Sequence, residues 1–318
     1  MEYRNFGNSD LKTSVVGFGT IQLGKNRGPV ADEQVVQAIH RALDLGVTCF
    51  DTAPIYGRGR SERILGKALG RRRRDVVLIT KCGLRWDQEG KMVLNGTRDS
   101  ILAEVEESLV RLGTDYIDLL LIHRPLLGAP LDETVSALQE ARRSGKARYV
   151  GVSNFTVAQL EESLRLGSLV AHEVGYNLFD RRTEEIIAFC QAKGIGVITY
   201  GSLSFGLLTG TFTKDTQFAD GVVYGQALFE RENYLKNLEV VEQLKRVAGS
   251  VGKSLPQLAL NWILSNPAIT AALTGCRRPE EIEDNVGALG WTLSAADKCR
   301  IEAIMKGAAG LSDRPFLA

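Results

Sequence analysis

Four polar residues with acid–base side chains stand at or just after the ends of short apolar runs. Asp51 closes the run VTCF, Lys81 follows VVLIT and His123 follows IDLLLI, while Tyr56 lies shortly after Asp51 in DTAPIYG. Apolar runs of this length predict buried strands. In a parallel barrel the C-terminal ends of all strands open onto one face, where catalysis takes place. A tyrosine, a lysine, a carboxylate and a histidine on that face would form a proton-donating site suited to a carbonyl group.

The proton donor in such a site would be Tyr56. A free tyrosine has a pKa near 10 and therefore gives up its proton slowly at neutral pH. A cation about 4 Å away, at an effective dielectric constant near 20, contributes roughly 4 kcal/mol, or about three pKa units. Lys81 can supply that cation, and Asp51 would keep the lysine charged. His123 would then orient the carbonyl oxygen or help to pass the proton.

Each of these residues also has a structural explanation when it is taken alone. A Tyr-Gly pair is common in turns, a lysine at a strand end often pairs with a core aspartate, and a single histidine often makes a structural hydrogen bond. Their joint occurrence at three different strand ends favours a functional site.

The elements that would position these side chains alternate along the chain. Apolar runs predict strands at residues 14–18, 47–50, 76–80, 116–122, 147–152, 170–174, 197–200 and 270–274. Helical patterns lie at residues 32–45, 98–112, 132–144, 156–166, 183–193, 234–249 and 255–265. Most begin at Asp, Ser or Thr, and many end at Gly, as capped helices do. Eight strands alternating with helices predict an α/β fold, a (β/α)8 TIM barrel, with an open doubly wound sheet as the alternative.

Two long segments interrupt this alternation. Residues 84–95 are polar and follow the third strand, and residues 201–233 contain glycine and phenylalanine and follow the seventh. Long loops at strand ends tend to be functional, so we expect both to rim the site. The tail at residues 307–318 would be a surface extension or a partial lid. Without a tandem repeat or a linker, the sequence predicts one domain over residues 1–318.

Composition excludes several classes of function. Hydrophobic residues make up 44% of the chain, which suffices for a full core, and the net charge of +1 indicates neither a nucleic-acid nor a membrane partner. The five cysteines are scattered without a CxxC pair, and His40 and His172 lack ligand-like spacing, so we expect reduced thiols and no metal. Neither a signal peptide nor a membrane-length apolar run is apparent, so we expect a cytoplasmic protein. The lack of a long exposed apolar stripe favours a monomer, and the basic run at residues 71–74 is expected to be a solvated turn.

A series of motifs identifies a family that the chain resembles. They are GFGTIQLG (17–24), DTAPIYG followed by Ser61-Glu62, TK (80–81), DYIDLLLIHRP (115–125), VGVSNF (150–155), YNLFDR (176–181), YGSLSFGLLTG (200–210) and TGCRRPEEIEDN (274–285). In this order, from residue 1 to about residue 290, they resemble the aldo-keto reductase superfamily and especially its bacterial members of the general-stress-protein type. The resemblance implies a (β/α)8 barrel that binds NADPH or NADP+ without a Rossmann fold. In keeping with this, the chain has no GxGxxG motif after a strand.

The resemblance also implies roles for individual residues. Tyr56 would be the general acid, Lys81 and Asp51 the pair that lowers its pKa, and His123 the residue that orients the substrate. Ser153, Asn154 and Glu173 would meet the nicotinamide carboxamide, and Tyr200 would stack on the nicotinamide ring. The segment from Gly201 to Gly206 would wrap the pyrophosphate with backbone N–H groups. Arg277 and Arg278 would bind the 2′-phosphate, and Glu281 and Asn285 would meet the adenine. Trp86 and Phe205 are candidates for the substrate pocket. The remaining predicted cofactor contacts are Gly19, Thr20, Ile21, Ser202, Leu203 and Gly275.

Two positions depart from the pattern of the family. Glu173 stands where glutamine is common, and its negative charge would favour the cationic oxidised cofactor, unless the side chain is protonated. Comparing the dissociation constants of NADP+ and NADPH in the wild type and in Glu173→Gln tests this hypothesis. Arg124 stands where tryptophan is frequent, and its side chain would either point into the helix layer, the interpretation that we favour, or offer a cation to an acidic substrate.

The sequence thus predicts an NADPH-dependent reductase that converts aldehydes or ketones to alcohols by hydride transfer. Two alternatives belong to other classes. A barrel aldolase would form a Schiff base at Lys81, but the lysine must then be neutral, which its pairing with Asp51 opposes. A cofactor-binding regulatory subunit would bind NADPH and would tolerate Tyr56→Phe, whereas a reductase would lose most of its turnover.

Overall fold

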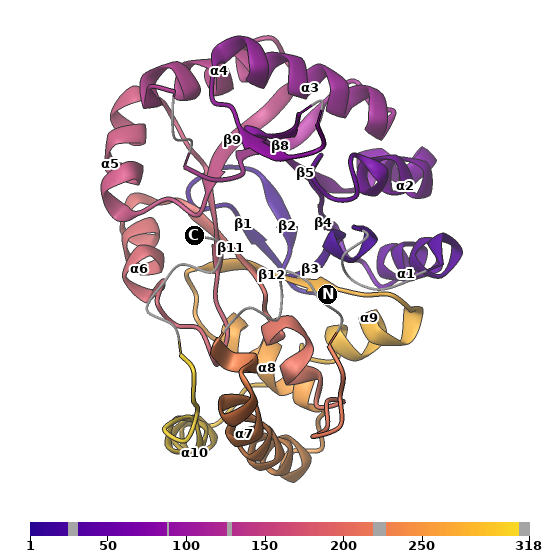
Figure 1. Cartoon of the computed structure of the whole chain (residues 1–318), viewed down its shortest axis with the longest axis vertical. Coiled ribbons are helices and arrows are strands. Elements are labelled where there is room, and N and C mark those ends of the chain that lie inside the picture. The colour runs from indigo at the N-terminus through magenta and orange to yellow at the C-terminus, as the bar shows by residue number, and fades with distance from the viewer. Residues whose placement is uncertain (25–30, 88, 126–128, 219–226, 312–318) are drawn as a thin grey trace.

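The computed structural model describes residues 1–24, 31–87, 89–125, 129–218 and 227–311. Eight parallel strands pair side by side and close into a barrel (Figure 1). This confirms the predicted TIM barrel and excludes the open sheet. The barrel strands are β3 (Val16–Gly19), β4 (Cys49–Asp51), β5 (Val77–Cys82), β8 (Ile117–Ile122), β9 (Ala147–Ser153), β10 (Ala171–Gly175), β11 (Gly196–Tyr200) and β12 (Ile269–Gly275).

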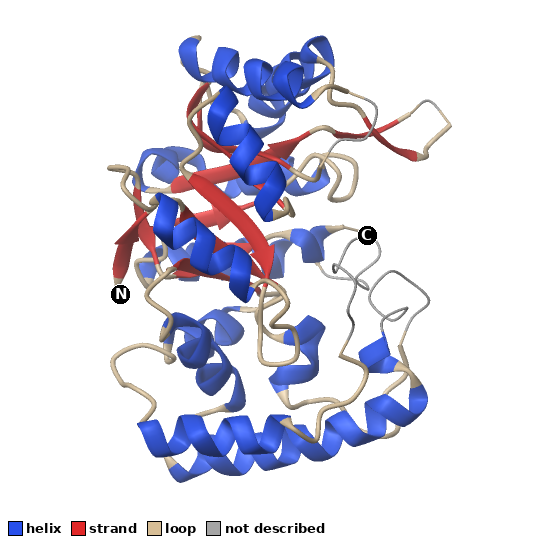
Figure 2. Ribbon diagram, turned by 90° about the vertical axis from the view of Figure 1, so that its left-hand side faces the viewer, coloured by secondary structure: helices blue, strands red, loops and turns tan. Residues whose placement is uncertain are grey.

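Helices surround the barrel and connect consecutive strands, as the side view in Figure 2 shows. The predicted helices are confirmed, with ends that differ by a few residues. They are α1 (Asp32–Asp44), α3 (Arg98–Leu112), α4 (Leu131–Arg143), α5 (Val157–Leu166), α6 (Glu184–Lys193), α7 (Arg231–Ser250) and α8 (Leu255–Leu264). The structure adds α2 (Arg60–Leu69), α9 (Pro279–Val286) and α10 (Ala295–Met305). Of these three helices, α10 packs against α7.

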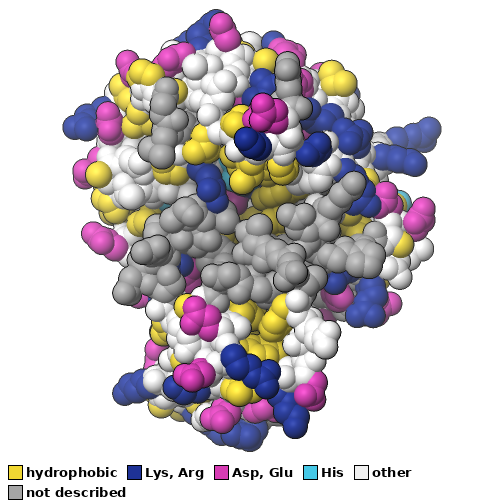
Figure 3. All heavy atoms as spheres, viewed as in Figure 1, with side chains coloured by type: hydrophobic (Ala, Val, Ile, Leu, Met, Phe, Trp, Pro, Cys, Tyr) yellow, Lys and Arg dark blue, Asp and Glu magenta, His cyan; other side chains and the backbone are white. Residues whose placement is uncertain are grey.

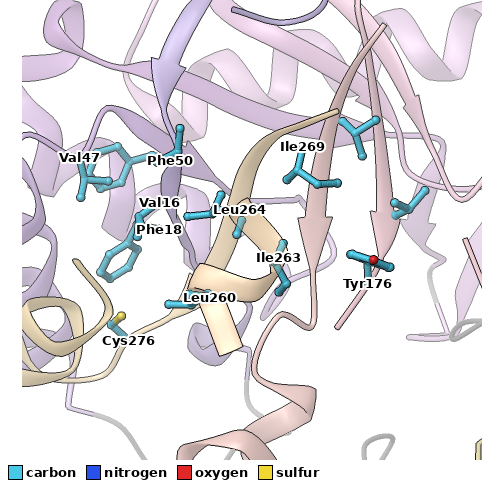
Figure 4. Close-up of a cluster of buried hydrophobic side chains, with 14 of the residues drawn as sticks. Val16, Phe18, Val47, Phe50, Tyr176, Leu260, Ile263, Leu264, Ile269 and Cys276 are labelled. Atoms are coloured by element: carbon cyan, nitrogen blue, oxygen red, sulfur yellow. The ribbon is translucent and has the colours of Figure 1, made fainter. Parts of the chain in front are cut away.

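Hydrophobic side chains fill the space between the barrel and the helices. Figure 4 shows Leu260, Ile263 and Leu264 of α8 close to Ile269 at the start of β12 and to Val16 of β3. All five side chains are buried. This layer holds the strands in place, so that residues at their C-terminal ends have fixed positions.

A second, smaller cluster of buried side chains fills the barrel itself. Every second residue of a strand points inward, because side chains alternate between the two faces of a strand. The inward-facing members from the strands are Cys49, Val77, Ile79, Leu119, Leu121, Ala171, Ile198, Ala271 and Leu273. Phe6 and Leu11 join them from the N-terminal hairpin of β1 (Tyr3–Asn5) and β2 (Lys12–Ser14), which lies across one end of the barrel (Figure 1).

The segment at residues 84–95, predicted as a polar loop, contains a hairpin of β6 (Leu84–Trp86) and β7 (Met92–Leu94). The turn uses Gly90 with a positive φ of 80°, which glycine adopts at little cost. The hairpin was missed because each strand has only three residues, too few for an alternating pattern to stand out.

The other long segment contains the 3₁₀ helices η4 (Ser204–Thr209) and η5 (Ala227–Phe229), and residues 219–226 lie outside the described part. Of the tail, residues 307–311 are described, and Asn237 of α7 bonds to the backbone of Ala309 at 2.9 and 3.0 Å. Whether the tail forms a lid depends on residues 312–318, which lie outside the described part. The described helices include none that is both long and apolar enough to cross a membrane.

Candidate active site

Three of the four predicted catalytic residues occupy inward-facing positions at the C-terminal end of the barrel, and Tyr56 lies in the loop between β4 and α2. Asp51 follows Cys49 by two residues, Lys81 follows Ile79, and His123 follows Leu121. Alternation therefore turns all three side chains toward the barrel axis above its apolar filling. Glu173 and Tyr200 hold the equivalent positions after Ala171 and Ile198.

Lys81 and Asp51 form a buried ion pair. The Lys81 Nζ lies 2.6 Å from Asp51 Oδ2 and also donates to the carbonyl oxygen of Thr52 at 3.3 Å. Burial opposes the charge of Lys81, but the carboxylates of Asp51 and Glu173 outweigh it and raise the pKa of the lysine above its ordinary value. Lys81 therefore stays protonated, as a Schiff-base nucleophile could not.

Tyr56 and His123 stand beside this pair. The ring centroids of Tyr56 and His123 are 5.9 Å apart in an edge-on arrangement, and the Lys81 Nζ lies 5.6 Å from the centre of the Tyr56 ring. The structure thus brings the four predicted catalytic side chains together.

The pKa of Tyr56 differs from the net lowering that the sequence predicted. Burial raises the pKa of Tyr56 above its ordinary value, Lys81 lowers it, and the carboxyl groups of Asp51 and Glu173 raise it further. Lys81 thus acts in the predicted direction but is outweighed, because burial disfavours the charged phenolate. Burial, Lys81 and Arg124 hold the pKa of His123 well below its usual range, so that its imidazole is neutral at pH 7.

Asn154 links the predicted nicotinamide residues to one another. Its Nδ2 donates to the carbonyl oxygen of His123 at 3.1 Å and to Ser153 Oγ at 2.9 Å, while its Oδ1 accepts from the Tyr200 hydroxyl at 2.7 Å. The Tyr200 ring lies over Gly175, where an added Cβ would come within 3.3 Å of ring atoms. Gly175 therefore leaves room for the ring in its present position.

Several polar atoms in this region have no hydrogen-bond partner within the described part of the chain, although they are buried. They include Gln22 Oε1 and Ser204 Oγ. A buried polar atom without a partner is costly, so such atoms indicate a polar ligand. The nicotinamide carboxamide and the phosphates of a dinucleotide have the matching donors and acceptors. The residues present therefore fit the predicted cofactor.

Gln22 and Ser204 are candidate cofactor contacts that sequence reasoning missed. Both lie inside quoted motifs, GFGTIQLG and YGSLSFGLLTG, but neither type of residue stands out by its chemistry. Gln22 reaches across to the residue that follows β12, where its Nε2 donates to the carbonyl oxygen of Cys276 at 2.8 Å. A Cβ added at Gly275 would lie 3.1 Å from Gln22 Oε1, so this glycine keeps the approach open.

The segment predicted to wrap the pyrophosphate has an unusual backbone. Gly201, Ser204, Phe205 and Gly206 all have positive φ, which is uncommon for the two residues with side chains. Asn177 Nδ2 donates to the carbonyl oxygen of Gly201 at 2.9 Å and so anchors the start of the segment. Within the segment, the Ser204 N–H donates to the carbonyl oxygen of Gly201 at 2.7 Å and the Gly206 N–H to that of Leu203 at 3.0 Å, so an anion would have to meet other N–H groups of the segment.

The remaining predicted cofactor residues are placed as follows. Thr20 is buried and donates from Oγ1 to the carbonyl oxygen of Asp51 at 2.8 Å, which supports the strand end that carries the aspartate. Ile21 is exposed, Ser202 is buried beside Thr199, and Gly19 and Gly275 lie opposite each other on β3 and β12. Leu203 is partly buried.

The predicted phosphate and adenine contacts lie around the start of α9. Arg277 and Arg278 are exposed, and Glu281 accepts from the Arg277 backbone N–H at 2.7 Å and pairs with the Arg278 Nη2 at 3.3 Å. Asn285 is buried and its Nδ2 donates to Cys276 Sγ at 3.3 Å. The geometry thus places the two arginines at a helix N-terminus, where an anion is favoured.

The candidates for the substrate pocket lie on the two long segments. Trp86 of β6 is partly exposed, with the Arg58 guanidinium 4.9 Å from the centre of its ring. Phe205 lies close to Gly201, where an added Cβ would be 3.6 Å from the ring. Figure 3, from the viewpoint of Figure 1, shows hydrophobic side chains and Lys or Arg side chains together around the middle of this face.

Arg124 directly follows His123, and its charge acts on residues of the candidate site. Its side chain is partly buried, and its Nε has no hydrogen-bond partner within the described residues. Its charge is one cause of the low pKa of His123, and it interacts electrostatically with Tyr200. These charge effects reach residues of the candidate site, as a role of Arg124 toward an acidic substrate requires.

The described residues contain no group of three or more His, Cys, Asp or Glu side chains that could hold a metal ion.

Comparisons with known proteins agree with the fold. The model of the aldo/keto reductase family matches residues 15–306. The aldo-keto reductase YhdN of Bacillus subtilis is 37% identical over 312 residues, covering 96% of this chain and 94% of that protein. The NADH-specific methylglyoxal reductase of Escherichia coli is 36% identical over 310 residues, covering 92% of this chain and 94% of that protein.

A solved structure is similar over almost the same length. The glycerol dehydrogenase AKR11B4 from Gluconobacter oxydans has a TM-score of 0.88 and 34% sequence identity, covering 95% of this chain and 94% of that one. The closed barrel, the four side chains gathered at its mouth and these matches lead to one conclusion: the chain belongs to the aldo/keto reductase family of oxidoreductases.

Proposed function

We propose that this protein is an NADPH-dependent carbonyl reductase that converts aldehydes or ketones to alcohols, with Tyr56 as the proton donor. The observation that carries the proposal is the position of Lys81. Its ammonium is fully buried, 2.6 Å from Asp51 and 5.6 Å from the centre of the Tyr56 ring, and the His123 ring lies 5.9 Å from the Tyr56 ring.

Tyr56 is suited to give its proton to a strong base. Because burial raises its pKa, the phenol keeps its proton at neutral pH until a base such as a forming alkoxide appears. Lys81 then stabilises the phenolate that remains, and Asp51 keeps Lys81 charged and in place. Proton transfer of this kind contributes about 10²- to 10⁴-fold to a rate.

His123 would position the substrate rather than exchange protons. A neutral imidazole can donate one hydrogen bond, and its ring stands edge-on to that of Tyr56. A carbonyl oxygen held between the two would be polarised and would lie close to the phenolic proton.

The family uses nicotinamide cofactors, and this chain offers groups for each part of one. When bound, the cofactor supplies the hydride that reduces the carbonyl carbon. Ser153, Asn154 and Glu173 would hold the carboxamide, and Tyr200 would support the ring. The backbone from Gly201 to Gly206 would bind the pyrophosphate.

Two arginines at the start of α9 support a preference for NADPH. Arg277 and Arg278 are exposed next to a helix N-terminus, and a guanidinium can give a phosphate two parallel hydrogen bonds. A 36% identical relative is named as NADH-specific, so NADH must be tested beside NADPH.

The first experiment follows the loss of dihydronicotinamide absorbance with a panel of aldehydes and ketones. We expect turnover with NADPH that exceeds turnover with NADH, and a loss of about 10²- to 10⁴-fold in kcat for Tyr56→Phe. Tyr149→Phe is the matched control, because the Tyr149 hydroxyl pairs with Asp10 outside the candidate site.

Other outcomes would favour the alternatives. Binding of NADPH without turnover by any substrate, equal in the wild type and in Tyr56→Phe, would favour a cofactor-binding regulatory subunit. Covalent trapping of substrate on Lys81 by borohydride would favour the aldolase. Faster turnover with NADH would refute the cofactor preference but not the reductase.

A further inference from the structure

Glu173 is a second buried carboxyl group at the catalytic lysine. It lies on β10, in register with Ser153 on β9 and Ile198 on β11, and its side chain is 4% exposed. Its Oε2 lies 3.3 Å from the Lys81 Nζ, and its carboxyl group also interacts with that of Asp51. Two carboxyl groups therefore share one ammonium in a place that solvent hardly reaches.

One lysine can neutralise only one of these carboxylates. A second buried negative charge would be uncompensated, which costs several kcal/mol in a protein interior. Burial accordingly raises the pKa values of both Asp51 and Glu173, that of Glu173 to about 8. The pair retains one proton at neutral pH. Because Asp51 makes the shorter contact with Lys81, the negative charge belongs mainly to Asp51.

The other titratable groups that face Glu173 do not change charge near neutral pH. Burial raises the pKa values of Tyr56, Tyr200 and Cys49, the last to about 12, so these groups stay neutral. Lys81 stays charged, because its carboxyl neighbours outweigh the effect of burial. The pKa of His123 is well below its usual range, so its ring stays neutral. Among these groups, therefore, the carboxyl pair of Glu173 and Asp51 is the one that can lose a proton between about pH 6 and about pH 9.

Resting on the proposed function, we propose that Glu173 releases its proton when the oxidised, cationic form of the cofactor binds, so that alkaline pH favours the oxidised cofactor and alcohol oxidation. Glu173 lies beside Ser153, whose Oγ donates to the Glu173 carbonyl oxygen at 3.1 Å, and its charge acts on Tyr200. These are the residues proposed to hold the nicotinamide. The positive ring would compensate the second carboxylate, while the lost proton passes to the solvent. The reduced ring is neutral and gives no such compensation.

The direction of the pH effect follows from linkage. The positive ring lowers the pKa of the carboxyl pair, so binding releases a proton at any pH between the lowered value and about 8. In this range the affinity for the oxidised cofactor rises up to about 10-fold per pH unit, and above about pH 8 it becomes constant. The reduced cofactor shows no such rise from this pair.

The experiment measures binding rather than activity. Calorimetric titrations of the wild type in buffers of different ionisation enthalpy give the number of protons released, for NADP+ and for NADPH. The 2′-phosphate also titrates, with a pKa near 6, but it is present in both forms and cancels in their difference. Glu173→Gln is the matched variant, because its carboxamide has the shape of the carboxyl group and can form hydrogen bonds but cannot ionise.

We expect the wild type at about pH 7 to release up to about one proton more with NADP+ than with NADPH. In Glu173→Gln the two forms should release equal numbers, and the ratio of their dissociation constants should not change with pH. Equal proton release in the wild type overturns the inference, even if the variant fails to fold. A pH-dependent ratio that persists in Glu173→Gln also overturns it. Failure of the wild type to bind either form, or NADH or NAD+, refutes the proposed function itself.

Discussion

Lys81 determines the charge of the candidate site more than any other residue. Two carboxyl groups, a phenol and a main-chain carbonyl all turn toward its ammonium. Replacing the lysine would leave Asp51 buried without its partner, so loss of activity in such a variant would not isolate one role. Substitutions of residues at the edge of the site leave the Lys81–Asp51 pair in place and can therefore test one role at a time.

Arg124 is one such residue, and we expect it to select substrates. Its Nε is buried without a partner among the described residues, and its charge acts on both His123 and Tyr200. Arg124→Met should lower kcat/KM about 10- to 100-fold for an aldehyde that carries a carboxylate, because a charge-assisted hydrogen bond contributes about 1.5–3 kcal/mol.

The measurement compares succinic semialdehyde with butanal, which has the same chain length and no charge. Arg124→Lys should retain part of the preference, because it keeps the charge without the planar fork. An equal loss for both aldehydes in Arg124→Met would contradict a role in substrate choice and would indicate that the arginine supports His123.

At the scale of elements, the site could be predicted because strands have a period of two. Once residues 76–80 and 116–122 are recognised as strands, the inward positions lead directly to Lys81 and His123. Glu173 follows by the same rule. Gln22 and Ser204 could not be found in this way, because each lies in a 3₁₀ turn where no period relates sequence to direction.

Electrostatics was the least predictable property of these elements. The distance from Lys81 indicated a lowered pKa for Tyr56, but the degree of burial, which sequence does not give, reversed the net direction. The basic run at residues 71–74 was expected to be a solvated turn, and Arg71, Arg72 and Arg74 are exposed as expected. Arg73 is instead buried, and its Nη1 lies 2.7 Å from Asp118.

Glu104 of helix α3 is a buried acid that contacts Gly83, the residue before the β6–β7 hairpin. Glu104 accepts from the Gly83 N–H at 3.0 Å and from Ser100 Oγ at 3.2 Å, and burial raises its pKa to about 7. The folded protein therefore holds this proton more tightly than the unfolded chain does. Between about pH 4.5 and about pH 7, this group makes the protein less stable as the pH rises, and the loss is complete above that range.

We expect Glu104→Gln to remove this dependence. We compare the free energies of unfolding of the variant and the wild type at each pH. From about pH 4.5 to about pH 8, this difference should shift in favour of the variant by on the order of 3 kcal/mol, since each pKa unit corresponds to about 1.4 kcal/mol. Thermal unfolding across this range measures the difference. Glu107→Gln, on the exposed side of the same helix, is the control and should give a constant difference. A constant difference for Glu104→Gln as well would show that the carboxyl group is not the source.

In the whole molecule, the two ends of the barrel have separate tasks. Catalytic side chains gather where the strands end, whereas Asp118 lies near the start of β8, the strand that leads to His123. Asp118 is 1% exposed and binds the Arg73 Nη1 at 2.7 Å, the Arg148 Nη1 at 3.0 Å and the Leu78 N–H at 3.0 Å. This network ties β5, β8 and β9 together at the end remote from the chemistry.

We therefore expect Asp118→Asn to affect stability and not catalysis. Removing one partner of a buried ion pair costs about 3–5 kcal/mol, because the other charge stays buried without compensation. Denaturant unfolding should show this loss, while kcat per folded molecule and the Kd of the cofactor remain those of the wild type. Asp75→Asn is the control, because its contact with Arg72 is exposed and 3.5 Å long, and such pairs contribute at most about 1 kcal/mol. A fall in kcat without a loss of stability would mean that β8 transmits changes from Asp118 to His123, and that the two ends of the barrel are not independent.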